Sequence, residues 1–412
     1  MTTTSSGAPS PAEAAALAAA RSRFPGALAQ SYIDVASRGL MPGDLPQLAF
    51  DHLQARVAGR ADKQLYFRIV EDARTEVARL LNVGAHEIAT TRNVTDGLNM
   101  VANALEWQAG DEVILCSAIE HPANLYVWRN LAPLGVEVRD LPAVNGEFPV
   151  EALEAALARC RRPRLVSLSA TSFVPGFRAD LDRIAASCRA AGALLVVDGA
   201  QAVGITHLDL ARTPVDALAF STQKGLCSLY GLGFLYVREA VAEPLKPRYL
   251  SRFGIDLDGH EADYDAGPLR LQKGALRFEL GNPNFLGALL VGHSTRLINE
   301  VGTQAIDRHV TALASRLAEG LIELGAPVRR PVQGSIANIV SIESQQGPAP
   351  AGLLHAHLKS RSVHAALRRD VVRFSFHLYN VQEDVDAALR ACGAWLAQNG
   401  DRLKVRSAAV HA

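Results

Sequence analysis

Short hydrophobic runs alternate with helical patterns through the middle of the chain. From about residue 87 the runs are EIATTR, EVILCS, VEVRDL, RLVSLS, ALLVVD and DALAFS. Between them lie stretches of helical pattern, among them TDGLNMVANAL, PANLYVWRNLA, PVEALEAALARC and ADLDRIAASCRAA. Strands that alternate with helices of ten or more residues predict a mostly parallel sheet with helices on both faces. The run ALLVVD is apolar almost throughout, which is typical of a strand buried on both sides.

A second, smaller region of helix and strand follows. Beyond residue 284 a long helical pattern runs from NFLGALLVGH to LAEGLIELG, and IANIVSIE, AGLLHAHLKSR, VVRFSFHLYN and EDVDAALRACGAWLAQN come after it. We therefore predict a large α/β domain over residues 51–284 and a small C-terminal α/β domain over residues 285–412. Residues 1–50 are expected to form an arm and part of the small domain. Ligands in such folds bind beyond the carboxyl ends of strands, often between lobes.

Composition narrows the class of function. The chain has 412 residues, of which 49% are hydrophobic and 20% charged, and this length favours two lobes. Its 42 basic and 42 acidic residues cancel, which gives no electrostatic basis for binding nucleic acid or an anionic membrane surface. The sequence has no apolar run of about 18 residues, and its N-terminal alanine run lacks the basic region of a secretory signal. We expect a protein that acts on small molecules.

The cysteines predict neither a disulfide framework nor a metal site. They are odd in number, widely spaced and form no C-x-x-C pair: Cys116, Cys160, Cys188, Cys227 and Cys392. A reducing cytoplasm fits this usage best.

Two ionisable residues follow predicted buried strands and together indicate a particular chemistry. Asp198 ends the run LLVVD, where its charge needs compensation, either by loop amides and the next helix or by a bound cation or protonated heterocycle. Lys224 follows the strand ALAFS, where it is either a surface residue with a buried stem or a desolvated amine that forms Schiff bases. Pyridoxal 5′-phosphate (PLP) requires a Schiff-base lysine and an acid at its pyridine nitrogen. The pair, about 26 residues apart, therefore favours PLP.

Other strand-end residues suit the rest of that cofactor. In NVTDGLNMV, Thr95 lies where a helix follows a strand, so it is either an ordinary N-cap or part of an anion site at the helix N-terminus. Ser221 and Gln223 lie close before the lysine in the sequence. They add a hydroxyl donor and an amide donor. His121 follows EVILCS and precedes Pro122; it is either solvated or placed to lie on the pyridine ring and relay protons.

The motifs resemble the class V aminotransferase family of fold type I PLP enzymes. The matching stretches are SYIDVASRGLMP, TTRNVTDGLNMVA, EHPANLYVW, SFVPGFRADL, VVDGAQAVG, STQKGLCSLYGLGFLYV, RFELGNPN and VRFSFHLYN, in the family's order from about Tyr32 to Leu389. The family includes cysteine desulfurases, isopenicillin N epimerase-like proteins, kynureninases and carbon-sulfur lyases. The resemblance implies a PLP enzyme with a mostly parallel large domain and a smaller α/β C-terminal domain.

The resemblance also implies roles for individual residues. Lys224 would carry the cofactor, Asp198 would face the pyridine nitrogen, His121 would stack on the ring and Gln201 would bond the phenolic oxygen. The residues implied around the phosphate are Val94, Thr95, Ser221 and Gln223, the last replacing a histidine typical of desulfurases. Asn282, where the family more often has threonine, would reach the phosphate of a neighbouring subunit, so the resemblance implies a homodimer with its active site at the subunit interface.

Substrate contacts are implied as well. Arg373 in VRFSFHLYN matches the arginine that holds an α-carboxylate, a role that suits its planar fork. Ala36 and Ser37 of SYIDVASRGLMP are expected beside the substrate. Arg368 and Arg369 are expected to face solvent, although one of them could help in binding.

Departures from the family pattern bear on the reaction. Cysteine desulfurases carry a mobile catalytic cysteine shortly before the carboxylate-binding arginine, whereas RSVHAALRRDVV contains none. Ala170 stands where desulfurases commonly have asparagine, and Cys227, three residues after the lysine, is expected to be a buried small residue. The pattern is closer to the isopenicillin N epimerase-like branch.

Four functions remain open at this point. The first is a carbon-sulfur lyase that acts by β-elimination on a cysteine conjugate without forming a persulfide on the enzyme. The second is an amino-acid epimerase, and the third is an oxidative decarboxylating deaminase or aminotransferase of secondary metabolism. The fourth is a degenerate, non-catalytic subunit that binds a partner; against it, every cofactor position is filled.

Overall fold

A seven-stranded sheet forms the centre of the protein. The computed structural model describes residues 9–257 and 269–403. The strands run in the order β2-β9-β8-β7-β5-β3-β4, and β9 is antiparallel to both of its neighbours while the other pairs are parallel. The bounds are β2 (Ile88–Thr91), β3 (Glu112–Leu115), β4 (Glu137–Asp140), β5 (Pro163–Ser169), β7 (Leu194–Asp198), β8 (Ala217–Ser221) and β9 (Gly233–Val237). The predicted mostly parallel sheet is confirmed.

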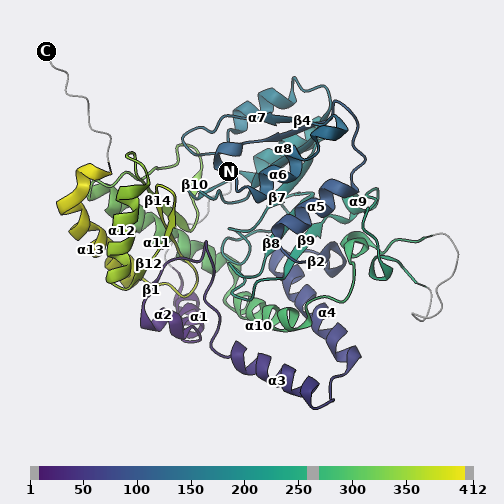
Figure 1. The fold of residues 1–412 in the computed structure, drawn as a ribbon, viewed down its shortest axis with the longest axis horizontal. Coiled ribbons are helices and arrows are strands. Elements are labelled where there is room, and N and C mark those ends of the chain that lie inside the picture. Colours follow the sequence, from purple (N-terminus) through teal and green to yellow (C-terminus); the bar gives the residue numbers. More distant parts are fainter. Residues whose placement is uncertain (1–8, 258–268, 404–412) are drawn as a thin grey trace.

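Helices cover both faces of this sheet (Figure 1). One face packs against α4 (Lys63–Leu81), α7 (Val150–Leu157), α8 (Leu181–Ala191) and α10 (Phe285–Val301). The other packs against α5 (Val94–Ala104), α6 (Ala123–Arg129) and α9 (Glu239–Ala242). Along β7, Leu195 and Val197 belong to the first core and Val196 to the second, because successive strand residues point to opposite faces. The run ALLVVD is therefore apolar because both of its faces are buried.

A smaller antiparallel sheet lies beside the first, at the left of Figure 1. Its order is β11-β14-β13, with β11 (Ile339–Glu343), β13 (Ala366–Arg368) and β14 (Val371–Ser375). The helices near it are α11 (Thr303–Glu323), α12 (Pro348–Ser360) and α13 (Gln382–Asn399). The N-terminal segment joins this region through β1 (Ser31–Tyr32), which pairs with β12 (Val363–His364). The domain boundaries at residues 50/51 and 284/285 stay a prediction.

The remaining elements connect the two sheets. The N-terminal segment forms α1 (Pro11–Arg21) and α2 (Pro25–Ala29), and α3 (Leu45–Val57) follows it. A short antiparallel pair, β6 (Phe177–Arg178) with β10 (Ser335–Ile336), joins the loop after β5 to the segment before β11. Next to this pair, both terminal nitrogens of Arg178 bond the Asp307 carboxylate of α11. Asp307 also accepts the amide of His207 at 3.0 Å, so it ties three segments together.

One sequence prediction differs in detail. The long helical pattern after residue 284 is two helices, α10 and α11, that meet at Gly302. Gly302 has a φ of +88°, a conformation that ends the first helix and is open to glycine at little strain. The apolar periodicity is the same on both sides of the break, which is why the pattern alone reads as continuous.

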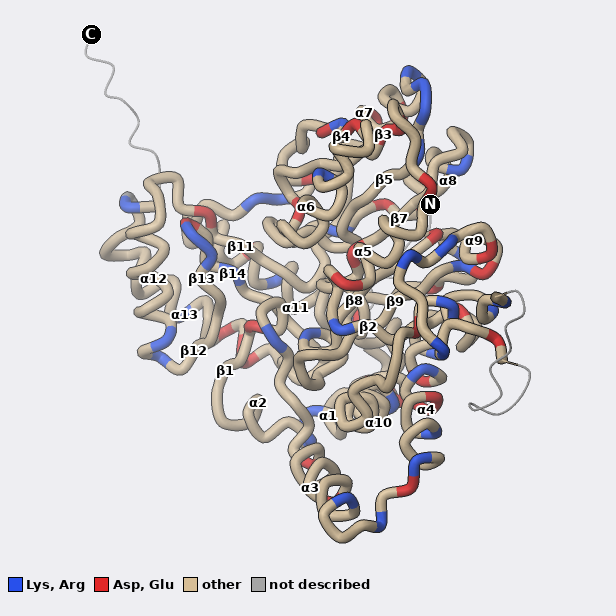
Figure 2. Tube along the Cα trace, turned by 45° about the vertical axis from the view of Figure 1, so that its right-hand side comes forward, with Lys and Arg blue, Asp and Glu red and all other residues tan. Residues whose placement is uncertain are grey.

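The charges of the described residues are mixed. Figure 2 shows basic and acidic positions interspersed along this part of the chain. In the described residues, no helix is long and apolar enough to cross a membrane.

Candidate active site

A cavity of about 160 Å³ lies at the carboxyl ends of β5, β7 and β8 and at the start of α5 and α6. Its position agrees with the rule that ligands bind at this edge of a parallel sheet. The cavity brings together all the predicted cofactor residues except Asn282. Its lining is Asn93, Val94, Thr95, His121, Ala123, Ser169, Phe173, Asp198, Ala200, Gln201, Ser221, Gln223 and Lys224.

Asp198 is the last residue of β7 and lies between Ser169 of β5 and Ala219 of β8 in the strand ladder. It is 4% exposed, and its Oδ1 accepts the Ala200 amide at 2.8 Å. Burial raises the pKa of Asp198, while the Ala200 amide and the charge of Lys224 oppose this shift. A buried carboxylate with so little compensation is suited to holding a positive charge in the cavity.

Lys224 lies in the turn after β8, and the turn is held from three sides. The Gln223 carbonyl accepts the Gly39 amide at 2.8 Å, and the Gly225 carbonyl bonds Nε2 of His377 at 2.8 Å. A Cβ at Gly225 would lie 2.1 Å from the Val203 carbonyl oxygen, so only glycine fits there. The turn is therefore rigid where the lysine leaves it.

The amine of Lys224 has a lowered pKa. Burial lowers it to about 8, Asp198 opposes the shift, and the positive charge of Arg373 adds to it. Within residues 9–257 and 269–403, Nζ has no hydrogen-bond or ion-pair partner. An amine of this kind is a nucleophile and a proton acceptor near neutral pH.

The start of α5 presents backbone donors to the cavity. Asn93, rather than Thr95, is the N-cap: its side chain accepts the Asp96 amide at 2.9 Å. The Val94 and Thr95 amides precede the first intrahelical bonds, so they are left for an anion. Thr95 is exposed and its hydroxyl is not used for capping. The interpretation of Thr95 as a simple N-cap is therefore wrong.

His121 faces the same cavity from the segment before α6. Its Nδ1 accepts the Ala123 amide at 3.2 Å, which leaves Nε2 to carry the ring proton. The ring meets that of Phe173 edge to face, with centroids 5.3 Å apart. Burial and then the charges of Lys224 and the nearby arginines lower the pKa of His121. The neutral ring is therefore the main form at neutral pH.

Gln201 links the cavity to the N-terminal segment. Its Nε2 donates to the Ala36 carbonyl at 3.1 Å, and its Oε1 is buried without a partner in the described part of the chain. Ala36 is itself fixed, because its amide donates to the hydroxyl of Ser375 in β14 at 2.9 Å. The side chain thus places a buried amide oxygen without a donor at the cavity wall.

Arg373 lies behind the cavity wall. It is fully buried, does not line the cavity, and bonds the Phe173 carbonyl at 3.2 Å and the hydroxyl of Ser37 at 3.4 Å. Arg368 donates to the same Ser37 hydroxyl at 2.7 Å and is half-buried, whereas Arg369 is exposed. The expectation of a solvent-facing residue is correct for Arg369 and wrong for Arg368.

Asn282 is exposed on the loop before α10 and is not brought to the cavity of its own chain. The loop is anchored by Glu279, which accepts both the amide and the hydroxyl of Thr90 and bonds Arg74 at 2.9 Å. Arg277 is also buried and donates to the carbonyls of residues 242, 243 and 245. The motif RFELGNPN thus fixes the base of a loop that projects outward.

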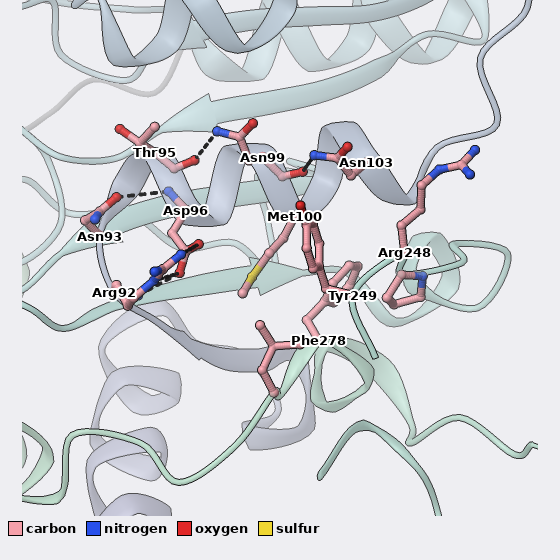
Figure 3. A pocket seen from close by; sticks show the side chains of 12 residues that line it. Arg92, Asn93, Thr95, Asp96, Asn99, Met100, Asn103, Arg248, Tyr249 and Phe278 are labelled. Atoms are coloured by element: carbon pink, nitrogen blue, oxygen red, sulfur yellow. Dashed lines mark hydrogen bonds and ion pairs between the residues drawn. The ribbon is translucent and has the colours of Figure 1, made fainter. Parts of the chain in front are cut away.

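A larger hollow of about 570 Å³ adjoins the cofactor cavity (Figure 3). The two share Asn93 and Thr95 as lining residues. In Figure 3, Asn99 and Asn103 follow Thr95 along α5, and Arg92 is bound to Asp96 beneath them. The opposite side carries the exposed Tyr249, next to Arg248, and Leu280. This surface lies directly outside the start of α5.

Three site residues are not found by the sequence reasoning. Ser169 ends β5 opposite Asp198, and the strand-end rule could have found it. Phe173 follows in the loop; it belongs to the stretch SFVPGFRADL, but the resemblance implied no role for it. Glu120 precedes His121 and is buried; it accepts the Ser169 amide at 2.7 Å and hydroxyl at 2.6 Å, and the Asn124 amide group at 2.9 Å. Burial raises the pKa of Glu120 to about 7.

The donor set fits PLP. A half-buried, unpaired lysine amine and a buried aspartate face one cavity, and the free amides of a helix start lie at its rim. The unsatisfied amide oxygen of Gln201 and the ring of His121 complete the wall. These are the groups that a phosphorylated, electron-withdrawing aromatic aldehyde requires. In the described residues, no group of three or more His, Cys, Asp or Glu side chains is suited to a metal ion.

Known proteins resemble the chain over most of its length. An uncharacterized aminotransferase of Bacillus subtilis is 29% identical over 77% of this chain and 82% of its own. A probable cysteine desulfurase of Pyrococcus abyssi is 29% identical over 77% of this chain and 81% of its own. The solved structure of the cystine C-S lyase C-DES, in complex with cysteine persulfide, superimposes with a TM-score of 0.78 at 24% identity and covers 90% of this chain and 99% of that one. Another structure of C-DES holds glycine linked covalently to its PLP cofactor.

The family model called aminotransferase class-V matches residues 54–388. This range includes the whole cavity as well as Arg373. The chain belongs to the class-V aminotransferase family.

Proposed function

We propose that the protein is a PLP-dependent carbon-sulfur lyase that removes a thiol from a cysteine conjugate by β-elimination. PLP is the cofactor of this family, and the coarser function, an enzyme that acts on amino acids with PLP, follows from membership. The observation that carries the finer proposal is a complete cofactor cavity that no thiol lines. The likeness to the cystine C-S lyase C-DES supports it.

All five cysteines lie within the described residues, and none lines the cavity. Cys227 is the nearest in sequence to Lys224, but it is fully buried, and burial raises the pKa of its thiol far above the ordinary value. A thiol in that state is neither accessible nor ionised, so it is no acceptor for sulfur. A reaction that releases sulfur as a free thiol therefore suits this site better than one that transfers it to the enzyme.

When bound, PLP withdraws electrons from the carbon skeleton of an attached amino acid. Lys224 then removes the proton from Cα, a role that suits an amine with a pKa of about 8. Asp198 holds positive charge at the depth of the cavity, and His121 covers its mouth with Nε2 placed to relay a proton. Arg373, with Ala36 and Ser37 beside it, binds the α-carboxylate.

The overall reaction consumes water and leaves no group on the enzyme. A cysteine conjugate R–S–CH₂–CH(NH₃⁺)–COO⁻ gives the thiol R–SH, pyruvate and ammonium. The test is to incubate the PLP-loaded protein with cystine and with S-alkyl cysteines, and to measure the three products. We expect equal amounts of each. Alanine with enzyme-bound sulfur, or a D-amino acid as the only product, would contradict the proposal.

Two variants provide the controls. Lys224→Ala should lose the visible absorbance that borohydride reduction removes in the parent protein, and should release no pyruvate. Cys227→Ser should keep elimination activity, because its sulfur lies outside the cavity. Loss of activity in Cys227→Ser with the cofactor still bound would count against a thiol-free mechanism.

We further propose that the protein acts as a homodimer in which Asn282 of one subunit approaches the cofactor of the other. The support is the large hollow outside Thr95, its exposed Tyr249 and Leu280, and the outward course of the Asn282 loop. Sedimentation should give twice the mass of the chain, and Asn282→Ala should weaken PLP binding. Mixing Lys224→Ala with Asn282→Ala subunits tests the exchange, since one of the two sites in the hybrid keeps both residues.

A further inference from the structure

Phe173 stands on a loop whose two ends are fixed. The hydroxyl of Ser172 accepts the amides of Gly176 and Phe177 at 3.1 and 3.0 Å, and the Ser172 amide donates to the Phe177 carbonyl at 3.0 Å. A Cβ at Gly176 would lie 2.3 Å from Cβ of Ile339, so the loop packs tightly on β11. The half-buried Phe173 ring, in contrast, extends from this base toward the cavity.

The ring separates two parts of the site. It meets the ring of His121, which also lines the cavity, and the guanidinium carbon of Arg373, which does not line it, lies 4.8 Å from its centre. Phe173 lines the cavity, whereas Arg373 does not line it and has no exposed surface. A carboxylate in the cavity therefore meets a phenyl ring before it meets the arginine.

Arg373 has few direct partners for a buried cation, although the Asp34 carboxylate interacts with it electrostatically. Its Nε is buried without a hydrogen bond, and no Asp or Glu of the described chain forms an ion pair with it. Its contacts are the Phe173 carbonyl, a long bond to Ser37 and the face of the Phe173 ring. Burial and then the charge of Arg368 lower its pKa to about 10, and the charge of Asp34 opposes this shift. The ring face is a weak substitute for an anion, because a cation–π contact is weaker than a buried ion pair.

We propose that Phe173 closes Arg373 off from the Lys224 cavity until the carboxylate of the substrate displaces its ring, so that Phe173 determines which amines are accepted. The inference rests on the proposed function only in taking an amino acid as the substrate. Rotation of the side chain exchanges the cation–π contact for a bidentate ion pair, and such rotations are fast. An amine without a carboxylate cannot form the ion pair that replaces the cation–π contact, so the ring stays in place and excludes this amine.

The first test measures how accessible Arg373 is, without reference to activity. The PLP-loaded enzyme and its Phe173→Ala and Phe173→Leu variants are treated with phenylglyoxal, and modified arginines are identified by mass spectrometry. We expect Arg373 to react about tenfold faster in Phe173→Ala than in the parent, with Phe173→Leu between them. The exposed Arg369 is the internal control and should react equally in all three. Equal rates for Arg373 in all three proteins would overturn the proposal.

The second test distinguishes a Phe173 ring that the carboxylate displaces from a ring that only contacts the ligand. L-alanine and L-alaninamide, which differ at the carboxylate, are titrated against the visible absorbance of the bound cofactor. Phe173→Ala should bind L-alanine about tenfold more tightly than the parent does, and it should also bind L-alaninamide, which the ring excludes from the parent. If both ligands weaken together, Phe173 is only a contact surface and the proposal fails. A parent protein without cofactor absorbance would instead contradict the proposed function, while the phenylglyoxal result would still decide the role of Phe173.

Discussion

Two buried residues near the cavity make opposite contributions to the pH dependence of stability. His377 is fully buried, and burial lowers its pKa to about 4. Glu120 is buried without a cation, and burial raises its pKa to about 7. The first residue favours the folded protein at high pH and the second favours it at low pH. Substitution of each residue separates the two contributions.

For His377→Gln we expect a loss of acid sensitivity. The unfolded chain binds a proton below about pH 6.5, whereas the folded protein does so only near pH 4, so folding stability falls as the pH drops through this window. The linked free energy is on the order of 3 kcal/mol. Urea unfolding of the cofactor-free protein at pH 7 and pH 5 measures it. The variant should be less stable at pH 7 yet lose less on acidification; identical pH slopes in parent and variant would refute the expectation.

For Glu120→Gln the sign is reversed. The folded protein keeps this proton up to about pH 7 and the unfolded chain only to about pH 4.5, so the contribution to stability is lost as the pH rises through that window. The variant cannot ionise and should gain on the order of 2 kcal/mol relative to the parent between pH 5 and pH 8. The same urea measurements detect it. A constant difference between the two proteins at every pH would show that Glu120 is not protonated in the fold.

At the scale of elements, the loop between β5 and β6 depends on Gly176. This residue has a φ of +101°, and a Cβ would lie 2.3 Å from Cβ of Ile339 and 3.0 Å from its carbonyl oxygen. Gly176→Ala therefore adds both backbone strain and overlap with β11. We expect a loss of about 3 kcal/mol or more in the free energy of unfolding, together with a change in substrate binding, because Phe173 moves with the loop.

Gly192 offers a matched control. It also has a positive φ, +70°, but a Cβ there would meet nothing within 4 Å. Gly192→Ala should lose only about 1 kcal/mol from backbone strain and leave substrate binding unchanged. The difference between the two variants in urea unfolding isolates the packing of the loop on β11. Equal losses would mean that Gly176 matters only for its backbone conformation.

The elements were predictable from sequence where a strand is buried on both faces. ALLVVD and DALAFS became β7 and β8, and they placed Asp198 and Lys224 at one edge because parallel strands end together. The split of the long C-terminal helical pattern at Gly302 was not predictable, because one glycine within a helical pattern is usually tolerated. Phe173 was also missed, because its role depends on contacts with residues 121 and 373, which are far away in the chain.

At the scale of the whole molecule, the ion pair between Arg178 and Asp307 joins the loop after β5 to α11. Arg178 belongs to the motif SFVPGFR, whose resemblance to the family predicted no role for it. Removing one partner leaves the other partly buried and unpaired, so Asp307→Ala should destabilise the protein by about 3 kcal/mol. The double variant Arg178→Met with Asp307→Leu should recover part of this loss. A double-mutant cycle in urea measures the coupling, and additive effects would show that the pair contributes nothing of its own.

The family and cofactor were predictable because the chemistry needs few residue types at strand ends. The reaction was not, because the residues proposed to bind the substrate come from segments that are distant in sequence. Arg373 of β14 meets Ser37 of the N-terminal segment and Phe173 of the central region in one cluster. No local pattern records which of these faces the substrate. The domain boundaries at residues 50/51 and 284/285 also stay predictions.

The turn that carries Lys224 is held by Gly39 on one side and by His377 on the other, at opposite ends of the chain. During synthesis, a ribosome must therefore finish nearly all of the protein before His377 can bond the Gly225 carbonyl of this turn. Nascent chains that have made the central sheet but lack residue 377 carry the lysine on an unsupported turn. Cofactor binding is thus expected as one of the last events of biogenesis. C-terminally shortened chains should lack the visible absorbance of bound cofactor even when their central sheet is formed.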